Sequence, residues 1–438
     1  MRARWLGVLA LALLAGAAAL VAAARRPRPV SESGAQPPAA RTAPSSEREA
    51  DDPEAPFPPG LGVDVPLHDP SGRALESFHR ALARVEAGEE KARLLFYGAS
   101  HTAVDHYVGR LREALQRRYG DAGRGFALAA WPHPQHYWQW GVRIDEGRGW
   151  DRLRLGAERA EADHYGLAGI VFDSAGREAT ARVATSEWGV GQRASRLEVW
   201  YQAQPGGGAL EVRVDGTLRK RIATHAPSIE AGFATFDLED GPHEVEMRAL
   251  PGAPVRLYGV VLEREGPGVV VDNAGLSGAR ARLHLKWLDP VYTQHLERRA
   301  PDLVSFSYGG NEGNDFGIPI STYASRTERA LARLRRTVPD ASCLIIGPPD
   351  KPVFEDGEWA HRPRTTSIAR VQRRLAEKHG CAFFDTIAFM GGRLSMLRWV
   401  AADPPLGRPD RVHFTARGYH RMAEVLLAGL LDGHAGRR

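Results

Sequence analysis

The stretch ARLLFYGASHTAVDHYVGRLREALQRRYG, residues 92–120, combines a strand, a turn of small residues and a helix. Its first seven residues form an apolar run that is typical of a strand buried on both faces. Four apolar residues from Val104 to Leu115 then recur at spacings of four, three and four, which predicts one amphipathic helix closed by Gly120. Strand, turn and helix in this order are typical of the beginning of an α/β domain.

The same alternation returns after about residue 263. Strands are predicted in GVVVDNAG (268–275), DLVSFSYGG (302–310), SCLIIGPP (342–349) and CAFFDT (381–386), and helices in TYASRTERALARLRRTVP (322–339), SIARVQRRLAEKHG (367–380) and TARGYHRMAEVLLAGLL (415–431). Strands that alternate with helices predict a mainly parallel sheet with helices on both faces. Catalytic groups in such sheets gather at the carboxyl ends of the strands.

The pattern between these two parts is different. Short alternating runs such as ATARVAT, SRLEVWYQ, ALEVRVDG and HEVEMRAL are separated by turn-rich pieces such as QPGGG and EDGP. Several strands at short intervals without helical patterns predict a β-sandwich. We therefore expect an α/β domain of residues 66–130 and 263–433, interrupted by an all-β module of residues 131–262.

The N-terminal sixty residues indicate export. Two arginines precede an apolar segment from Trp5 to Ala24, so residues 1–24 are typical either of a cleaved secretory signal or of an uncleaved membrane anchor. Both alternatives place the rest of the chain in the periplasm or cell envelope. Residues 25–60 are rich in Pro, Ala, Ser and charged residues and lack apolar periodicity, which predicts a disordered linker.

Composition sets wider bounds on the protein. The 438 residues are 43% hydrophobic and 25% charged, which is ordinary for a globular protein with two or three domains. The formal charge of +5 comes from arginines spread along the chain, so no nucleic-acid partner is expected. Cys343 and Cys381 each begin a predicted buried strand. A disulfide after export is one alternative, and two buried thiols are the favoured interpretation.

Three polar segments follow predicted strands. Ser100 begins the helix after the first strand, where a base could make its hydroxyl a nucleophile, although serine is also a favoured helix cap. The segment DNAGLSGA, residues 272–279, can direct a backbone N–H toward a ligand or form a plain turn. The segment SYGGNEGND, residues 307–315, holds Asn311 and Asn314, either of which could donate an amide N–H to a tetrahedral oxyanion.

A fourth segment, RPDRVHFTARGYH, precedes the last helix. Asp410 and His413 are three residues apart in it. At this spacing the carboxylate can hold one imidazole nitrogen while the other nitrogen accepts a proton from a serine. A single Asp-x-x-His occurs often by chance, and its place after three other strand-end segments gives it weight.

The four segments in this order resemble the SGNH hydrolases, also called GDSL esterases and lipases. The resemblance implies a flavodoxin-like three-layer α/β/α fold with a mainly parallel sheet. It also implies Ser100 as the nucleophile, His413 as the general base and Asp410 as the group that orients it. The oxyanion hole would be formed by the backbone N–H groups of Ser100 and Gly278 and the side chain of Asn311. No metal or cofactor is expected. The chain departs from the family at Ala99, where the family has aspartate.

A narrower resemblance is carried by HTAVDHYVGRLREALQRRYGDAGRGF, YGVVLEREGPGVVVDNAGLSGA and FMGGRLSMLRW. These segments are similar to bacterial peptidoglycan O-acetylesterases, in which a carbohydrate-binding-module-like β-sandwich is inserted into the hydrolase domain. The resemblance implies an exported serine esterase that removes O-acetyl groups from an acetylated polysaccharide of the cell envelope, with peptidoglycan as the first candidate. Alternatives are a glycan O-acyltransferase, another carbohydrate or lipid esterase of the same fold, and a carbohydrate-binding protein whose hydrolase domain has decayed.

Aromatic residues around the predicted insertion could stack on sugars. They are Trp131, Tyr137, Trp138, Trp140, Trp188 and Trp200. Packing is the favoured interpretation for them, and no sugar site is predicted from them. The stretch WPHPQHYWQW, residues 131–140, is an alternative candidate for the rim of the active site.

Overall fold

The computed structural model describes residues 57–132, 137–155 and 161–434. The predicted leader lies outside these residues, as does the predicted linker up to residue 56. Within the described ranges, no helix is both long and apolar enough to cross a membrane.

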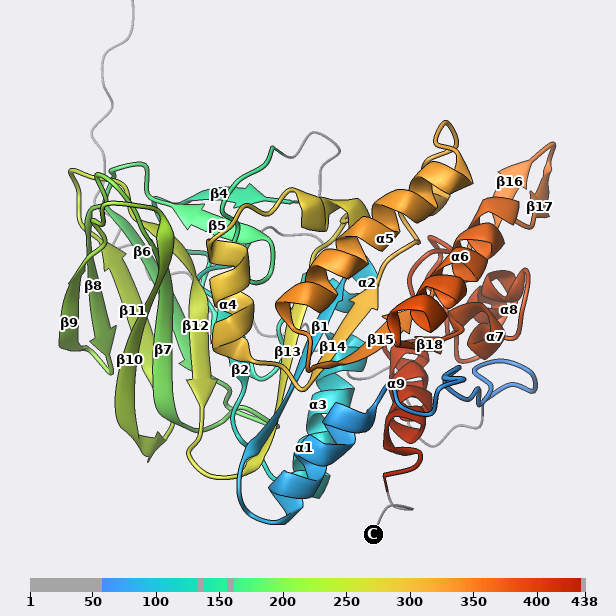
Figure 1. The fold of residues 1–438 in the computed structure, drawn as a ribbon, viewed down its shortest axis with the longest axis horizontal. Coiled ribbons are helices and arrows are strands. Elements are labelled where there is room, and N and C mark those ends of the chain that lie inside the picture. Colours follow the sequence, from blue (N-terminus) through green and yellow to red (C-terminus); the bar gives the residue numbers. More distant parts are fainter. Residues whose placement is uncertain (1–56, 133–136, 156–160, 435–438) are drawn as a thin grey trace, which may run out of the picture. The chain divides into compact units, whose positions relative to one another are not determined.

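A five-stranded parallel sheet organises the α/β part (Figure 1). Its strand order is β13, β1, β14, β15 and β18. The strands span Gly268–Gly275, Lys91–Gly98, Leu303–Ser307, Ser342–Ile346 and Ala382–Phe384. Every pair in the sheet is parallel. In chain order the sequence of strands is 2-1-3-4-5, the flavodoxin-like order, so the predicted fold class is confirmed.

Helices cover both faces of this sheet. Side chains of successive strand residues point to opposite faces, so the apolar residues of β1 need helices on both faces to be buried. Leu94 and Phe96 of β1 share a buried cluster with α1 (Glu76–Glu86), α3 (His106–Tyr119) and α9 (Ala416–Leu431). Leu95 and Tyr97 belong to a second cluster with α4 (Val291–Arg299), α5 (Ile320–Thr337) and α6 (Pro363–His379). The apolar run of the opening stretch is therefore buried on both faces, as its composition predicts.

The single helix predicted after the turn is wrong in one respect. The structure has a short helix α2 (Ser100–Ala103), then Asp105 with a left-handed φ of 55°, and only then α3. Asp105 is fully buried, where it pairs with Arg112 at 3.3 Å and accepts a hydrogen bond from Asn273 at 2.7 Å. A buried carboxylate needs such partners, and the break in the helix places it among them.

The middle of the chain forms two antiparallel sheets. One has the order β10-β7-β12-β5-β4, with β2 added to β12, and the other has the order β3-β6-β11-β8-β9. The strands of the first sheet span Glu230–Gly241, Ala194–Ala203, Arg256–Glu263, Ile170–Asp173, Asp151–Arg154 and Gly125–Leu128. Those of the second span Val142–Ile144, Ala179–Thr185, Glu244–Ala249, Ala209–Val214 and Thr217–Ala223. The prediction of an inserted antiparallel module is confirmed.

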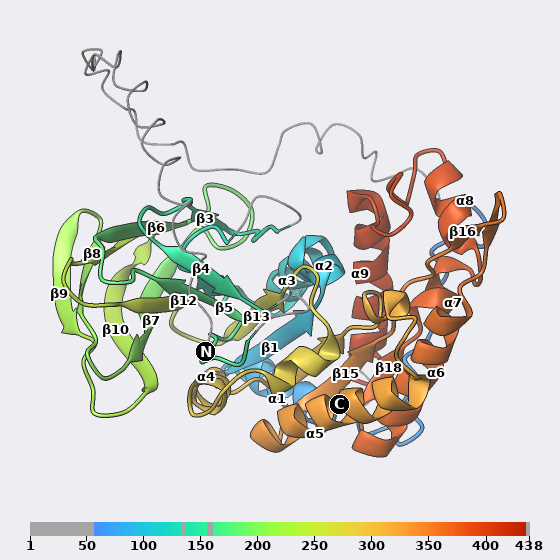
Figure 2. The same cartoon turned by 90° about the horizontal axis from the view of Figure 1, so that it is seen from above.

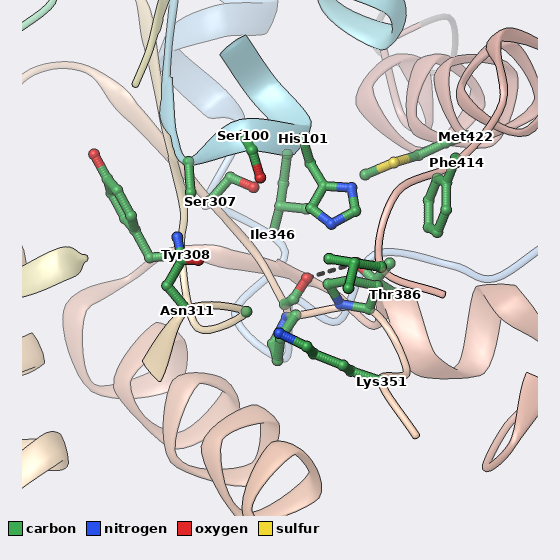
Figure 3. A pocket seen from close by; sticks show the side chains of 16 residues that line it. Ser100, His101, Ser307, Tyr308, Asn311, Ile346, Lys351, Thr386, Phe414 and Met422 are labelled. Carbon is green, nitrogen blue, oxygen red and sulfur yellow. Dashed lines mark hydrogen bonds between the residues drawn. The ribbon is translucent and has the colours of Figure 1, made fainter. Parts of the chain in front are cut away.

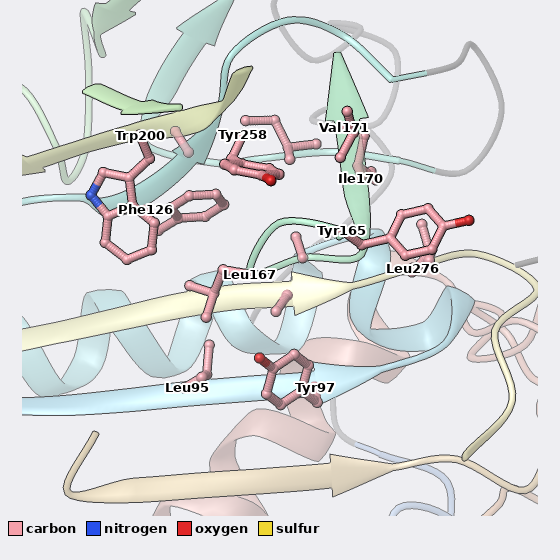
Figure 4. Close-up of a cluster of buried hydrophobic side chains, with 14 of the residues drawn as sticks. Leu95, Tyr97, Phe126, Tyr165, Leu167, Ile170, Val171, Trp200, Tyr258 and Leu276 are labelled. Atoms are coloured by element: carbon pink, nitrogen blue, oxygen red, sulfur yellow. The ribbon is translucent and has the colours of Figure 1, made fainter. Parts of the chain in front are cut away.

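The antiparallel sheets and the parallel sheet share one buried cluster (Figure 4). Leu95 and Tyr97 of β1 belong to it together with Phe126 of β2, Trp200 of β7 and Tyr258 of β12. Figures 1 and 2 both show the antiparallel strands on the β13 side of the parallel sheet. Strand β2, although it precedes the expected start of the insertion, pairs with β12 of the antiparallel sheet.

The expectation of two buried thiols is wrong. Cys343 and Cys381 form a disulfide with a Cα–Cα distance of 4.5 Å. Strands β15 and β18 are neighbours, and their register sets Leu344 opposite Ala382, so the two preceding cysteines face each other. This separation lies within the range that a disulfide bridges.

Glu263, at the end of β12, ties the antiparallel sheet to the parallel one. It is 4% exposed and pairs with Lys91 at 2.9 Å, Arg93 at 3.1 Å and Arg299 at 2.7 Å. Burial alone would raise the pKa of Glu263, but the three cations outweigh burial and hold the pKa well below its ordinary value.

Replacing this carboxylate is expected to reduce stability in a pH-dependent way. Glu263→Gln should lower the free energy of unfolding by about 3 kcal/mol at pH 7, because it breaks a buried ion-pair network. The folded-state pKa is depressed, so this stabilisation is present above the unfolded pKa of about 4.3 and is lost as the pH falls. Urea unfolding should therefore show the difference between wild type and variant shrinking from pH 5 to pH 3. A difference that stays constant would contradict this assignment, and Glu265→Gln, on an exposed neighbour, is the control.

Candidate active site

A pocket of about 40 Å³ lies at the carboxyl ends of the parallel strands (Figure 3). It is bounded by residues that follow β1, β14, β15 and β18 and by the start of the last helix. The lining residues are Ala99, Ser100, His101, Ser307, Tyr308, Gly310, Asn311, Ile346, Gly347, Pro348, Pro349, Lys351, Thr386, Val412, Phe414 and Met422. The predicted nucleophile and one predicted oxyanion group thus share one cavity.

Three predicted site residues form a continuous hydrogen-bonded chain at this pocket. Nε2 of His413 lies 2.9 Å from Oγ of Ser100. Nδ1 of the same ring lies 2.7 Å from Oδ2 of Asp410. With Asp410 holding Nδ1–H, Nε2 can accept the proton of the serine hydroxyl, which is the geometry of a nucleophile, a base and an orienting carboxylate.

Hydrogen bonds within the turn from Asp410 to His413 fix its conformation. Oδ1 of Asp410 accepts the backbone N–H groups of Val412 and His413, both at 2.9 Å. The next residue, Phe414, is fully buried against Trp399 at a ring distance of 4.5 Å. Partial burial alone would raise the pKa of Asp410, but the hydrogen bonds from His413 and Val412 outweigh it and lower the pKa to about 2. Asp410 is therefore ionised throughout the neutral range.

The turn that carries Ser100 is held without an aspartate at position 99. The Ala99 N–H donates to the Ser307 carbonyl at 3.2 Å, and the Leu276 N–H donates to the Gly98 carbonyl at 2.9 Å. Both flanking strands therefore fix the turn through backbone groups. Gly98 is required because an added Cβ would lie 1.9 Å from Oγ1 of Thr102.

Asn273 adds a side-chain contact that the sequence did not reveal. Asn273 lies in the segment DNAGLSGA, residues 272–279. Its Nδ2 donates to the Thr102 carbonyl at 2.8 Å and to the buried Asp105 at 2.7 Å. The nucleophile turn is thereby joined to the network behind it. Ala99 itself lines the pocket, so the departure from the family removes a carboxylate from beside Ser100.

The structure separates the two candidate asparagines. Asn311 lines the pocket, whereas Asn314 is exposed and accepts a hydrogen bond from Arg362 at 3.2 Å. Nδ2 of Asn311 donates one hydrogen to the Ala279 carbonyl at 2.9 Å. Its amide has a second hydrogen that can be donated to an oxyanion. Gly278, with φ of 79°, lies in the turn beside Ala279 but does not line the pocket.

Glu312 joins the loop that bears Asn311 to the residues that follow Gly278. Its side chain accepts the Gly309 N–H at 3.0 Å and the Ala281 N–H at 2.8 Å, and the residue is 3% exposed. Burial raises the pKa of Glu312 even though these N–H groups favour the ionised form. The residue carries no motif of its own, so sequence reasoning gave it no role.

His101, the residue after the predicted nucleophile, lies on the pocket wall. Its Nδ1 is 2.9 Å from the Tyr419 hydroxyl, and its ring packs 5.2 Å from the His413 ring. Burial, followed by the charges of His413 and Lys351, lowers the pKa of His101 well below its ordinary value. A neutral ring therefore packs beside His413 at neutral pH.

Of the aromatic stretch of residues 131–140, the described residues 131, 132 and 137–140 contribute nothing to the pocket lining. Residues 133–136 lie outside the described residues. Trp131 and Tyr137 are buried, and the Trp138 N–H donates to the Ala103 carbonyl at 3.0 Å. Trp200 is fully buried as well. Packing is thus the observed role for these side chains, whereas Trp188 is 44% exposed.

Comparison with known proteins finds one family model that matches the second part of the chain. The model of the GDSL-like Lipase/Acylhydrolase family matches residues 241–421, which include Asn311, Asp410 and His413. A solved peptidoglycan O-acetylesterase is similar at a TM-score of 0.70 and 26% sequence identity, over 84% of this chain and 99% of that chain. No curated protein sequence matches the chain significantly.

Two weaker structural similarities carry no weight for fold or function. Axe2, an acetylxylan esterase from Geobacillus stearothermophilus, has a TM-score of 0.29 and 25% identity over 37% of this chain and 73% of that chain. A family two carbohydrate esterase from Clostridium thermocellum has a TM-score of 0.28 and 12% identity over 64% and 98%. The sheet order, the family match and the first similarity agree with one another: the chain has the SGNH hydrolase fold, and its residues 241–421 match the GDSL-like Lipase/Acylhydrolase family.

Proposed function

We propose that this chain is an exported serine esterase that removes O-acetyl groups from a cell-envelope glycan, with peptidoglycan as the first candidate. The hydrogen-bonded series Ser100, His413 and Asp410 at the edge of one pocket carries the proposal. The similarity to a peptidoglycan O-acetylesterase over nearly all of that protein supports the substrate. The disulfide between Cys343 and Cys381 supports export, because disulfides persist in oxidising compartments.

The reaction follows from the geometry. Oγ of Ser100 attacks the acetyl carbonyl carbon while Nε2 of His413 takes the hydroxyl proton. The Ser100 N–H and the amide of Asn311 donate to the oxyanion. The Gly278 N–H is the third donor that the family resemblance implies, although Gly278 does not itself line the pocket. His413 passes its proton to the departing sugar oxygen, which leaves an acetyl ester on Ser100. Water, deprotonated by His413, then attacks this ester and releases acetate.

The size of the pocket supports an acetyl rather than a longer acyl group. One water needs roughly 10–15 Å³ of such space, so about 40 Å³ holds about three water-sized groups. An acetyl group has three non-hydrogen atoms besides the ester oxygen. Ile346, Phe414 and Met422 contribute apolar side chains to the pocket lining, and the Met422 residue is 3% exposed.

Shortening Met422 is expected to relax this preference. The wild type should cleave 4-nitrophenyl acetate at least about tenfold more efficiently than the butyrate ester, because two further methylenes do not fit. Met422→Ala opens the apolar end and should narrow the ratio to about twofold. Met247→Ala, a methionine truncated in the antiparallel core, is the matched control and should keep the wild-type ratio. If Met422→Ala keeps the wild-type ratio of acetate to butyrate cleavage, the acyl group does not bind against Met422.

The substrate is tested by measuring acetate release from O-acetylated peptidoglycan and from acetylated xylan side by side. We expect release from peptidoglycan, at a higher kcat/KM than from xylan, and none from either with Ser100→Ala. Release from xylan alone would retain an esterase and reject the envelope substrate. Equal release by wild type and Ser100→Ala would reject the esterase itself.

A further inference from the structure

Lys351 is a cation on the wall of the active-site pocket without an acidic partner. It follows β15, and its side chain extends along the pocket in Figure 3. Within residues 57–132, 137–155 and 161–434, no hydrogen bond or ion pair reaches its ammonium group. Burial, and next the nearby Arg362, lower the pKa of Lys351. A partly desolvated ammonium group lacks stabilising contacts here and can gain them from an anionic ligand.

Arg362, which contacts Lys351, and Arg411, which precedes the pocket residue Val412, also lack a carboxylate within ion-pair distance among the described residues. Arg362 is 9% exposed and donates to the carbonyls of Lys351 and Gly313, both at 3.4 Å. Arg411 donates to the Pro409 carbonyl at 3.0 Å. Asp410, the carboxylate whose charge reaches Lys351, is already bonded to His413. The neighbouring hairpin also carries the exposed carboxylates Glu355, Asp356 and Glu358, so the cation that distinguishes the pocket wall is Lys351, whose ammonium group has no ion pair among the described residues.

Exposed aromatic rings stand next to the same cations. Phe316 is 67% exposed and lies 5.2 Å from the Arg362 guanidinium. Trp359 is 37% exposed and lies 4.5 Å from the Arg411 guanidinium. Trp359 also packs at 5.1 Å on Phe354, which is 57% exposed.

Phe316 and Trp359 belong to segments that continue directly from residues of the pocket lining. Phe316 follows the Asn311 loop after β14, and the hairpin of β16 (Val353–Glu355) and β17 (Glu358–Ala360) begins two residues after Lys351. Figure 1 shows the hairpin on the side of the sheet to which the strand ends point. Exposed aromatic faces beside a reactive pocket are suited to the apolar faces of sugar rings. A glycan chain leaving the pocket would meet both aromatic rings and cations.

We propose that Lys351 binds a carboxylate of the glycan substrate while neighbouring sugars pack against Phe316 and Trp359. The inference rests on the proposed function and narrows its substrate class to O-acetylated glycans that bear carboxylates. Neutral acetylated glycans leave the ammonium group of Lys351 unpaired in the complex, so they bind less well.

The test compares one glycan with and without its carboxylates. Soluble fragments of O-acetylated peptidoglycan are used either as isolated or after conversion of their carboxylates to methylamides. Acetate release by the full chain gives kcat/KM for each. We expect wild type to prefer the untreated fragments by about tenfold, the factor that one hydrogen bond to a charged group contributes. Lys351→Gln should abolish this preference, and Lys351→Arg should retain most of it.

Lys220→Gln, on the exposed surface of β9, is the matched control and should behave as wild type. The inference is overturned if Lys351→Gln keeps the wild-type preference, if the variant loses the same factor on both substrates, or if wild type has no preference. Failure of the proposed function looks different, because Ser100→Ala would then release acetate as fast as wild type. Acetate release that depends on Ser100 but is indifferent to the carboxylates rejects only the role of Lys351.

Discussion

Replacing Ser100 by alanine is expected to lower kcat/KM for 4-nitrophenyl acetate and for O-acetylated peptidoglycan by at least about 10⁴-fold. The hydroxyl 2.9 Å from Nε2 of His413 is the proposed attacking group. The remaining donors can polarise the carbonyl but cannot form the ester intermediate. The residual rate should therefore approach that of water positioned in the pocket.

The folded state should tolerate this change well. Ser100 is buried at 9% exposure, and loss of one hydroxyl leaves the backbone bonds of its turn intact. Thermal unfolding of the variant should therefore lie close to that of wild type. Ser367→Ala, at a half-buried position of α6, controls for a general effect of serine removal and should keep full activity. A purified Ser100→Ala protein with the wild-type rate would refute the nucleophile and leave the alternative of a decayed, sugar-binding domain.

Asp410→Asn is expected to lower kcat by about 10³ to 10⁴-fold with little change in KM. The carboxylate lies 2.7 Å from Nδ1 of His413 and is the group that stabilises the imidazolium formed during attack. A neutral amide removes that charge, and its NH₂ group can also donate to Nδ1 and favour the wrong tautomer. Steady-state kinetics at pH 7 measures the loss directly.

The low pKa of Asp410 adds a pH criterion. Since this pKa is about 2, the carboxylate is ionised at every pH above about 4. Protonation of Asp410 should therefore reduce wild-type activity only below about pH 3, and an activity loss at higher pH must come from another group. Asp340→Asn, on an exposed carboxylate, should have no effect. If Asp410→Asn keeps kcat within tenfold of wild type, the carboxylate is not the orienting group.

Much of the fold could be predicted because its elements carry strong periodic signals. The apolar run of β1 and the alternating residues of β6 and β7 lie close to the observed bounds. Strand β9 was missed because all but one of its residues are exposed, so it has no apolar alternation. The break between α2 and α3 was missed because it serves Asp105, whose buried partners are distant in the chain. The disulfide depended on knowing that β15 and β18 are neighbours.

The residues of the candidate site also fall into those that the sequence predicts and those that only the folded chain reveals. Ser100, Asn311, Asp410 and His413 belong to short segments whose order identifies a family, and the structure brings them to one pocket or to its edge. The residues that shape the pocket carry no such motif. Met422, Thr386 and Lys351 reach it from a helix and from two strand ends, so only the folded chain shows them together. Glu312 and Asn273 lie within the quoted segments, but they act through backbone groups elsewhere in the chain. The sequence therefore does not predict their roles.

The central claim is that an acetyl group passes through an ester on Ser100. Mass spectrometry of peptides from the enzyme, quenched in acid within milliseconds of mixing with 4-nitrophenyl acetate, tests it most directly. The account predicts a transient acetyl group on the peptide that contains Ser100, and its absence in Ser100→Ala. Acetate release without acetylated Ser100, or with a transient acetyl group on a different residue that forms and decays at the rate of turnover, would contradict it.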